Sequence, residues 1–136
     1  MAFHNQVGNW GEQIARDYLV SHGYAIVAQN ERVGNIEIDI IAMKDDRIIF
    51  VEVKTRSTHF VDPLEAIDQR KMARLAKAAD LYVRSMEIPH DPQIDLIAVI
   101  GAKDAPRDAI TVEHIPDAFL PPLGGALPPA RSKLDN

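Results

Sequence analysis

Apolar residues at the start of the chain recur at the spacing of a helix. The positions that share one helical face are Val7, Trp10, Ile14 and Tyr18. Gly23 follows the last of them, where a glycine commonly ends a helix. The pattern predicts a first helix from about Asn5 to His22.

Three short segments follow that are apolar and partly β-branched, which is the composition of strands. They are Tyr24–Gln29, Glu37–Met43 and Arg47–Thr55. The tight polar sequence Lys44-Asp45-Asp46 separates the last two segments. We therefore expect these two to pair as an antiparallel hairpin.

A second helix is predicted to begin at Asp62 and Pro63, because aspartate caps helix starts and proline fits the first helical position. Its apolar stripe consists of Met72, Leu75, Ala76, Ala79, Tyr82, Val83 and Met86. Further on, Ile94–Ile100 is predicted as a buried strand and Ala109–Glu113 as an edge strand. The order is helix, three strands, helix and strand, which describes an α/β domain.

The length of the chain, 136 residues, is typical of one domain that buries its own core. From Pro116 onward proline and glycine become frequent, as in segments that form no core of their own. We expect one domain over residues 1–116 and a Pro/Gly-rich tail over residues 117–136.

Composition excludes several classes of protein. Hydrophobic residues make up 46% of the chain, which argues against disorder, and the absence of cysteine excludes disulfides and thiolate metal sites. No apolar run approaches the ~20 residues that span a bilayer, and the first residues lack the features of a secretory signal. We expect a cytoplasmic protein that has no membrane partner.

Charged side chains mark the predicted hairpin. If its turn is the two-residue one, Asp39 lies opposite Glu52, and Glu37 lies opposite Lys54. Opposed carboxylates repel, and flanking isoleucine and valine make their burial costly unless a cation compensates. Mg2+ or Mn2+, which take oxygen ligands, would compensate. The alternative is a solvated sheet face with cross-strand ion pairs, and the pattern alone favours neither interpretation.

Two segments of the hairpin resemble a known family. Residues 36–42, Ile-Glu-Ile-Asp-Ile-Ile-Ala, and residues 50–56, Phe-Val-Glu-Val-Lys-Thr-Arg, resemble the signature of the YraN-like family of bacterial proteins. That family is similar to archaeal Holliday junction resolvases and belongs with the PD-(D/E)xK nucleases. The resemblance extends to Gly11-Glu12, Gly23-Tyr24, Asn30, Lys71 and Ala78-Ala79.

This resemblance implies a restriction-endonuclease-like αβββαβ core with a mixed central sheet flanked by helices. It implies that Asp39 and Glu52 hold Mg2+ or Mn2+ together with the backbone carbonyl of Val53, and that Lys54 is catalytic. It also implies that Glu12 reaches the metal, although the helical pattern alone indicates a solvated charge. A homodimer is expected from the resemblance as well.

A basic stripe is predicted on the second helix of a chain whose formal net charge is -5. Arg70, Arg74, Lys77 and Arg84 fall within about 80° of one another around the helix. Such a stripe by itself is more often a solvated face. Beside the acidic cluster, a phosphate-tracking surface is the better interpretation, and the residues expected to bind nucleic acid are Arg56, Arg70, Lys71, Arg74 and Lys77.

These observations favour a metal-dependent, structure-selective endonuclease acting on nucleic acid, with DNA as the expected substrate. The alternative is a nucleic-acid- or protein-binding module that keeps the nuclease fold without cleavage. The five histidines are scattered along the sequence, and none of them has metal-ligand spacing on a helix.

Overall fold

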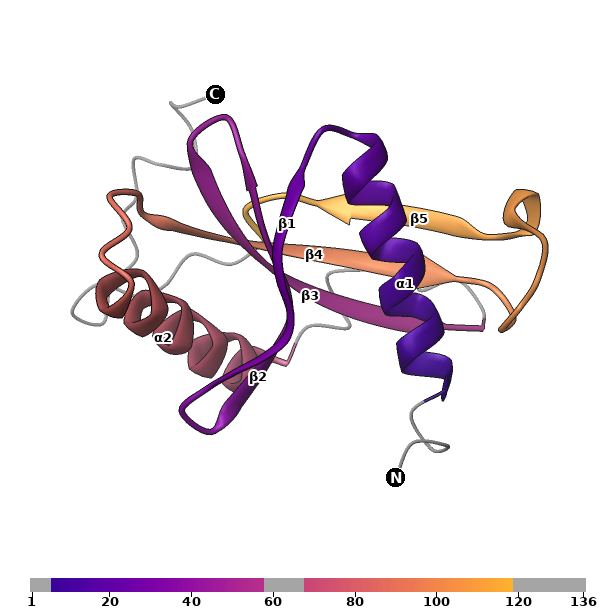
Figure 1. Ribbon diagram of the computed structural model, residues 1–136. Helices are drawn as coiled ribbons and strands as arrows, with labels where there is room; N and C mark the ends of the chain where they lie inside the picture. Colours follow the sequence, from indigo (N-terminus) through magenta and orange to yellow (C-terminus); the bar gives the residue numbers. More distant parts are fainter. Residues whose placement is uncertain (1–5, 58–67, 119–136) are drawn as a thin grey trace.

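The computed structural model describes residues 6–57 and 68–118, in which two α-helices flank one five-stranded sheet (Figure 1). The elements are α1 (Gln6–Ser21), β1 (Ala25–Val33), β2 (Ile36–Lys44), β3 (Arg47–Arg56), α2 (Gln69–Ser85), β4 (Pro92–Ile100), the short 3-10 helix η3 (Arg107–Ala109) and β5 (Thr111–Ile115). Within these ranges, no helix has the length and apolar character needed to cross a membrane.

The strands are ordered β1-β2-β3-β4-β5 across a mixed sheet. Neighbouring strands are antiparallel except β3 and β4, which are parallel. A parallel pair needs a crossover connection, and α2 lies in the connection between these two strands. The structure thus confirms the predicted restriction-endonuclease-like αβββαβ order, and β5 adds an antiparallel strand at the far edge.

Each face of the sheet is covered by one helix, α1 on one side and α2 on the other (Figure 1). The core under α1 contains Ile14, Ala15, Leu19, Ile40, Ala42, Ile49, Val51, Ile97 and Val99. The core under α2 contains Ile38, Ile41, Ile48, Phe50, Met72, Leu75, Ala76, Ala78, Ala79, Tyr82, Val83 and Ile94. Successive residues of β3 therefore enter opposite cores, and this strand is the buried centre of the molecule.

The second helix begins later than predicted. Asp62 and Pro63, the expected start, lie outside the described residues, and α2 begins at Gln69. Asp68 is the N-cap, because its backbone is extended and its side chain accepts hydrogen bonds from the N–H groups of the first turn. The capping mechanism was correctly anticipated, but it operates at a different aspartate.

The last strand is also displaced from its predicted position. Arg107–Ala109 form η3, so β5 begins at Thr111 rather than at Ala109. Past β5, the N–H of Ala118 donates a hydrogen bond to the carbonyl of Ile94 at 2.8 Å. The rest of the predicted Pro/Gly-rich tail, residues 119–136, lies outside the described residues.

Candidate active site

The hairpin of β2 and β3 has the turn predicted from the sequence. Its two turn residues, Asp45 and Asp46, adopt positive φ angles of 52° and 65°, as tight two-residue hairpin turns require. From this turn the strands pair as far as Ile40 and Val51. The predicted register is therefore confirmed over this part of the hairpin.

Beyond that point the two strands separate, and Asp39 and Glu52 lie at the opening instead of in the β2–β3 ladder. β2 continues beside β1, where Glu37 pairs with Arg32, whereas β3 continues beside β4. The predicted pairing of Glu37 with Lys54 is therefore wrong, since the strands diverge before reaching it.

Asp39 spans this opening with its side chain. Its Oδ2 accepts a hydrogen bond from the backbone N–H of Val53 at 2.9 Å. On either side of Asp39, Ile38 packs in the core under α2 and Ile40 in the core under α1. The alternation of side chains between the two faces of the sheet is thus broken at Asp39. The backbone of β3 holds the Asp39 carboxylate in place through the Val53 N–H.

Three carboxylates, those of Glu12, Asp39 and Glu52, form what we call the carboxylate cluster. Glu52 is the most buried of them, with 2% of its surface exposed. Its Oε2 lies 2.7 Å from Nζ of Lys71 on α2 and 3.6 Å from Nζ of Lys54 on β3. The two ammonium groups offset the cost of burying this charge. Lys71 was expected on the nucleic-acid-binding surface, but the structure directs its ammonium to Glu52.

Glu12 belongs to the carboxylate cluster from α1, which covers the face of the sheet opposite to α2. Its neighbour Gly11 allows this approach, because a Cβ at Gly11 would collide with the side chain of Thr55 on β3. The helix therefore lies close against the strand, and the side chains of Glu12 and Asp39 are near enough for each to shift the pKa of the other. The structure brings together the three carboxylates that the resemblance implied.

Crowding of carboxylates changes their protonation. Burial, followed by the charge of Glu52, raises the pKa of Asp39 from its usual 3.8 to about 8, against the opposing hydrogen bond from Val53. Burial and the charge of Glu37 raise the pKa of Glu12, while its interaction with the side chain of Asp39 acts in the opposite direction. Both shifts arise first from burial and then from the neighbouring carboxylates, so this site favours the protonated forms of Asp39 and Glu12.

The donor chemistry of this site suits a hard divalent cation, because Glu12, Asp39 and Glu52 supply carboxylate oxygens. In the described part of the chain, however, no three His, Cys, Asp or Glu side chains are already grouped as a metal site. The reason is visible in the contacts, since Glu52 Oε2 faces the ammonium of Lys71 and Asp39 Oδ2 faces the Val53 amide. These residues match a hard divalent cation in kind, but their present contacts do not form a metal site.

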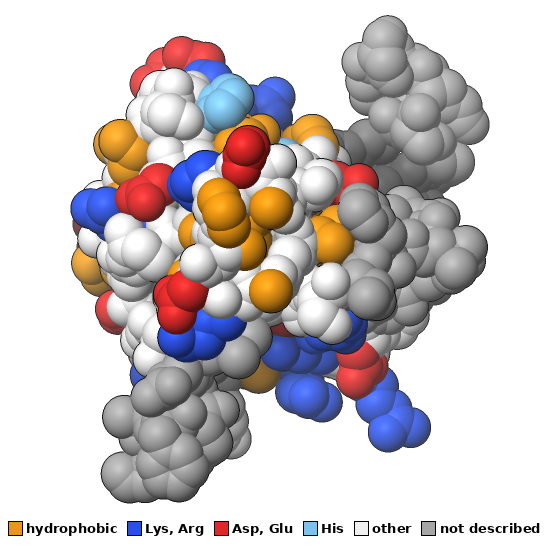
Figure 2. All heavy atoms as spheres, turned by 90° about the vertical axis from the view of Figure 1, so that its right-hand side faces the viewer, with side chains coloured by type: hydrophobic (Ala, Val, Ile, Leu, Met, Phe, Trp, Pro, Cys, Tyr) orange, Lys and Arg blue, Asp and Glu red, His pale blue; other side chains and the backbone are white. Residues whose placement is uncertain are grey.

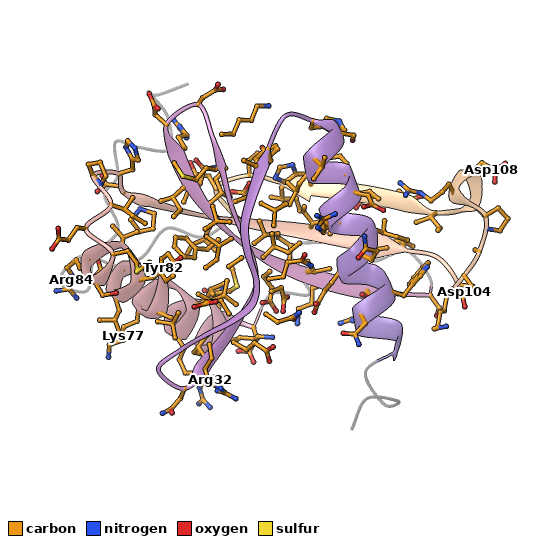
Figure 3. All side chains as sticks on the ribbon, viewed as in Figure 1. Arg32, Lys77, Tyr82, Arg84, Asp104 and Asp108 are labelled. Atoms are coloured by element: carbon orange, nitrogen blue, oxygen red, sulfur yellow. The ribbon has the colours of Figure 1, made fainter. Side chains whose placement is uncertain are left out.

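The basic stripe predicted on α2 is exposed. Arg70, Arg74 and Lys77 face solvent, and Arg56 is exposed at the end of β3. Arg84 forms an ion pair with Asp80 at 2.9 Å. Figure 3 shows Lys77 and Arg84 projecting from α2 away from the sheet. Seen from the right-hand side of Figure 1, Lys and Arg side chains gather along the lower edge of the molecule (Figure 2).

A groove of about 380 Å³ lies between this stripe and the turn that joins β1 to β2. Gly34 and Asn35 of the turn line one side, and Arg74, Lys77 and Leu81 of α2 line the other. Figure 3 shows Arg32 beside the same turn. The basic stripe therefore borders a concave surface that begins one helical turn beyond Lys71.

A polar network on the α1 side of the sheet was not predicted. Asp95 of β4 is fully buried, and its Oδ2 lies 2.7 Å from Nε2 of His114 on β5. Because a carboxylate only accepts, this nitrogen carries the proton, and Nδ1 faces the hydroxyl of Tyr18 at 3.1 Å. Asp95 also accepts hydrogen bonds from the side chain of Gln93 and the backbone of Asp117. The available signal was Asp95 itself, the one polar residue in the predicted buried strand Ile94–Ile100.

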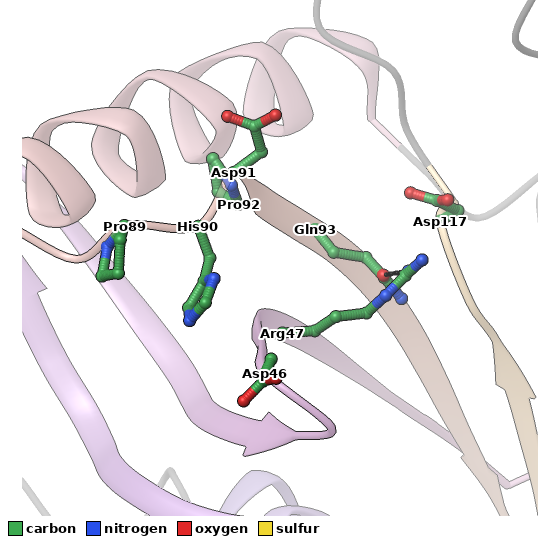
Figure 4. A pocket seen from close by; sticks show the side chains of 8 residues that line it. All are labelled: Asp46, Arg47, Pro89, His90, Asp91, Pro92, Gln93 and Asp117. Carbon is green, nitrogen blue, oxygen red and sulfur yellow. Dashed lines mark hydrogen bonds between the residues drawn. The ribbon is translucent and has the colours of Figure 1, made fainter.

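A second hollow, also of about 380 Å³, lies where β3 and β4 begin. Figure 4 shows the side chains around it, among them Arg47 and Gln93, which are hydrogen-bonded to each other, and His90. None of the predicted site residues lines it. This hollow is therefore separate from the carboxylate cluster.

Comparison with known proteins gives relatives over most of the chain. The family model described as "Uncharacterised protein family UPF0102" matches residues 11–99. A UPF0102 protein of Bacteroides thetaiotaomicron is 44% identical over 124 residues, which is 90% of this chain and 99% of that protein. A UPF0102 protein of Syntrophomonas wolfei is 48% identical over 81 residues, covering 59% of this chain and 70% of that protein.

Among solved structures, the structure of Pyrococcus furiosus SfsA in complex with Ca2+ is matched at 15% identity and a TM-score of 0.33. The match covers 82% of this chain and 62% of that chain. The family match confirms the resemblance found in the sequence, and the family itself is described as uncharacterised.

Proposed function

This chain belongs to the uncharacterised protein family UPF0102, the YraN-like family, and for it we propose metal-dependent hydrolysis of phosphodiester bonds in nucleic acid. The observation that carries the proposal is the group of Asp39, Glu52 and Glu12 at the opening between β2 and β3, with two lysines beside it. Buried carboxylates at one point need a cation, and phosphodiester cleavage needs a cation at the reacting phosphate.

Asp39, Glu52 and Glu12 would hold Mg2+ or Mn2+, and the carbonyl of Val53 stays a predicted further ligand. When bound, the metal would supply positive charge at the scissile phosphate and lower the pKa of a coordinated water. Lys54 is the proposed catalytic lysine. Its ammonium is partly buried beside Glu52, from where it orients the attacking water and stabilises the negative charge that develops on the phosphate oxygens.

Substrate binding is assigned to the basic side of α2. Arg70, Arg74 and Lys77 are exposed in a chain of net charge -5, so affinity for a polyanion is concentrated on this stripe. The stripe starts next to Lys71, which contacts the carboxylate cluster directly. A phosphate backbone lying along α2 would therefore lead to the site, and we propose structure-selective cleavage of DNA.

One contact favours the alternative function, a nucleic-acid- or protein-binding module without cleavage. The ion pair of Lys71 with Glu52 occupies an oxygen that a metal would require. If that pair persisted when nucleic acid bound, the chain would keep the fold and the basic surface but would not perform the chemistry.

Incubation of the purified protein with branched and duplex DNA in Mg2+ or Mn2+ tests the proposal. We expect nicks from the wild type, and we expect Lys54→Ala to stop cleavage while leaving DNA binding largely intact, because Lys54 acts mainly in the transition state. Binding without cleavage in either metal would favour the binding module. Cleavage that survives in both Lys54→Ala and Asp39→Ala would point to a contaminating nuclease.

A further inference from the structure

Lys71 occupies a fixed place in the first turn of α2. Oδ1 of Asp68 accepts hydrogen bonds from the backbone N–H groups of Arg70 at 3.0 Å and of Lys71 at 3.4 Å. This cap determines where the helix begins and therefore where the Lys71 side chain departs from it. From there the side chain reaches β3 and places Nζ 2.7 Å from Oε2 of Glu52.

The Glu52 carboxylate requires a cation nearby, because 3% of its side chain is exposed to solvent. An ionised carboxylate buried to that extent is costly without a partner. Lys71 provides a contact of hydrogen-bond length, whereas Lys54 stands at 3.6 Å from the same oxygen. Of the two lysines, Lys71 is the principal counter-ion of Glu52.

The oxygen that Lys71 contacts is also one that a divalent metal would take as a ligand. Resting on the function proposed above, we propose that Lys71 is a built-in counter-ion which the metal displaces from Glu52, and that the freed ammonium then pairs with a phosphate of the substrate. The displacement explains why the site contains the carboxylates of a metal centre although, in the described residues, they are not arranged as a metal site.

Lys71 is able to leave Glu52 because its surroundings differ from those of Lys54. The Lys71 side chain is 41% exposed, against 21% for Lys54, and its helical neighbours Arg70 and Arg74 face solvent. Once displaced, Lys71 joins that row of cations. Metal binding and phosphate binding therefore strengthen each other, and by linkage each does so by the same factor.

Chemical labelling of lysines in the wild-type protein tests the displacement directly. The protein is treated with an amine acylating reagent with and without saturating Mn2+, and the labelling rate of each lysine is measured by mass spectrometry. We expect Mn2+ to raise the rate at Lys71 several-fold, because an ammonium released from its contact with Glu52 becomes accessible to the reagent. Lys103, in the connection between β4 and β5, serves as the control and should label at an unchanged rate.

Calorimetric titration with Mn2+ provides the second readout. Lys71→Met removes the competing cation and should tighten Mn2+ binding by about tenfold, within the usual range of coupling between sites. Lys71→Arg keeps a cation and should bind Mn2+ about as weakly as the wild type. Lys103→Met removes one positive charge whose ion-pair partner is Asp104 rather than a carboxylate of the site, and it should leave the affinity unchanged.

The outcomes separate this proposal from the function on which it rests. If Mn2+ binds but labelling of Lys71 does not rise, the displacement is overturned while the metal site stands. Equal or weaker Mn2+ binding by folded Lys71→Met would also overturn it. If neither the wild type nor Lys71→Met binds Mn2+ at millimolar concentration, both the displacement and the metal-dependent function fail. The labelling readout uses the unaltered protein, so it does not depend on the folding of any variant.

Discussion

The N–H of Val53 donates a 2.9 Å hydrogen bond to Oδ2 of Asp39 at the point where β2 and β3 stop pairing. The carboxylate of Asp39 thus accepts a hydrogen bond that a backbone carbonyl of β2 would accept if the ladder continued. The bond favours the ionised form of Asp39, whereas burial and Glu52 favour the protonated form and prevail. Stability and pH are therefore coupled at this residue.

Without divalent metal, we expect the protein to lose stability as the pH rises. The pKa of Asp39 is raised from 3.8 to about 8 on folding, so between these values the folded protein binds more protons than the unfolded chain. Unfolding free energy then falls with increasing pH across this window. Melting temperatures measured from about pH 5 to pH 8 should decline for the wild type and decline less for Asp39→Asn. Identical pH profiles for the two proteins would contradict the shift.

Replacement of Gly11 by alanine should destabilise the fold, although alanine is normally the better helix former by about 1 kcal/mol. The added Cβ would collide with the side chain of Thr55 and push α1 away from β3. We expect a loss of about 1–3 kcal/mol in urea denaturation, as is usual for overpacking. The double variant Gly11→Ala/Thr55→Ala removes the obstacle and should recover most of the loss. No recovery would mean that the close approach is not limited by Thr55.

Asp95→Ala should have a large effect on stability and none on the metal site. The substitution leaves the donors of Gln93 and His114 and the amide of Asp117 without their shared acceptor, at a cost of about 3 kcal/mol or more. Urea denaturation checks this loss against Asp91→Ala, which removes an exposed carboxylate and should change stability little. Calorimetry of the folded Asp95→Ala protein should show Mn2+ affinity like that of the wild type. Loss of Mn2+ binding would assign Asp95 to the site.

The triple variant Arg70→Ala/Arg74→Ala/Lys77→Ala should bind DNA more weakly whatever its sequence. If each side chain meets one phosphate, the slope of log affinity against log salt should fall by about 2–3, since each contact contributes roughly 0.9. Fluorescence anisotropy at several salt concentrations measures the slope. Lys103→Ala/Arg107→Ala is the control, because these residues lie beside Asp104 and Asp108 at the far end of the molecule from α2 (Figure 3). Wild-type affinity and slope in the triple variant would exclude this face of α2.

The architecture was predictable because local patterns agree with the global fold. Runs of β-branched residues predicted β2 and β3, and the two-residue turn Asp45-Asp46 predicted their register near the turn. The start of α2 was missed because many aspartates in a sequence could cap a helix, and the pattern did not single out Asp68. Local propensity also gave no sign that the hairpin would open at Asp39.

The site was partly predictable for the same reason. Asp39, Glu52 and Lys54 belong to one hairpin, so the sequence predicted that they lie near one another, although the ladder ends before Asp39 and Glu52. The approach of Glu12 depends on the packing of α1 against β3, and only the family resemblance indicated it. That Lys71 contacts Glu52 could not be read from a helical wheel, which shows the face of a helix but not what lies opposite. The bond of Asp95 to His114 depends on which strand becomes the neighbour of β4.

The parallel pairing of β3 with β4 has a consequence for the order of folding. β1, β2 and β3 meet through short turns, so this meander can form early, whereas β4 reaches its place only after α2 has crossed the sheet. Until then Glu52 lacks the cover of the helix and the ammonium of Lys71, and water solvates its charge. We therefore expect the carboxylate cluster to be assembled in the last stage of folding. A chain that ends before α2 would contain the strands that carry Asp39 and Glu52 but would lack the complete site.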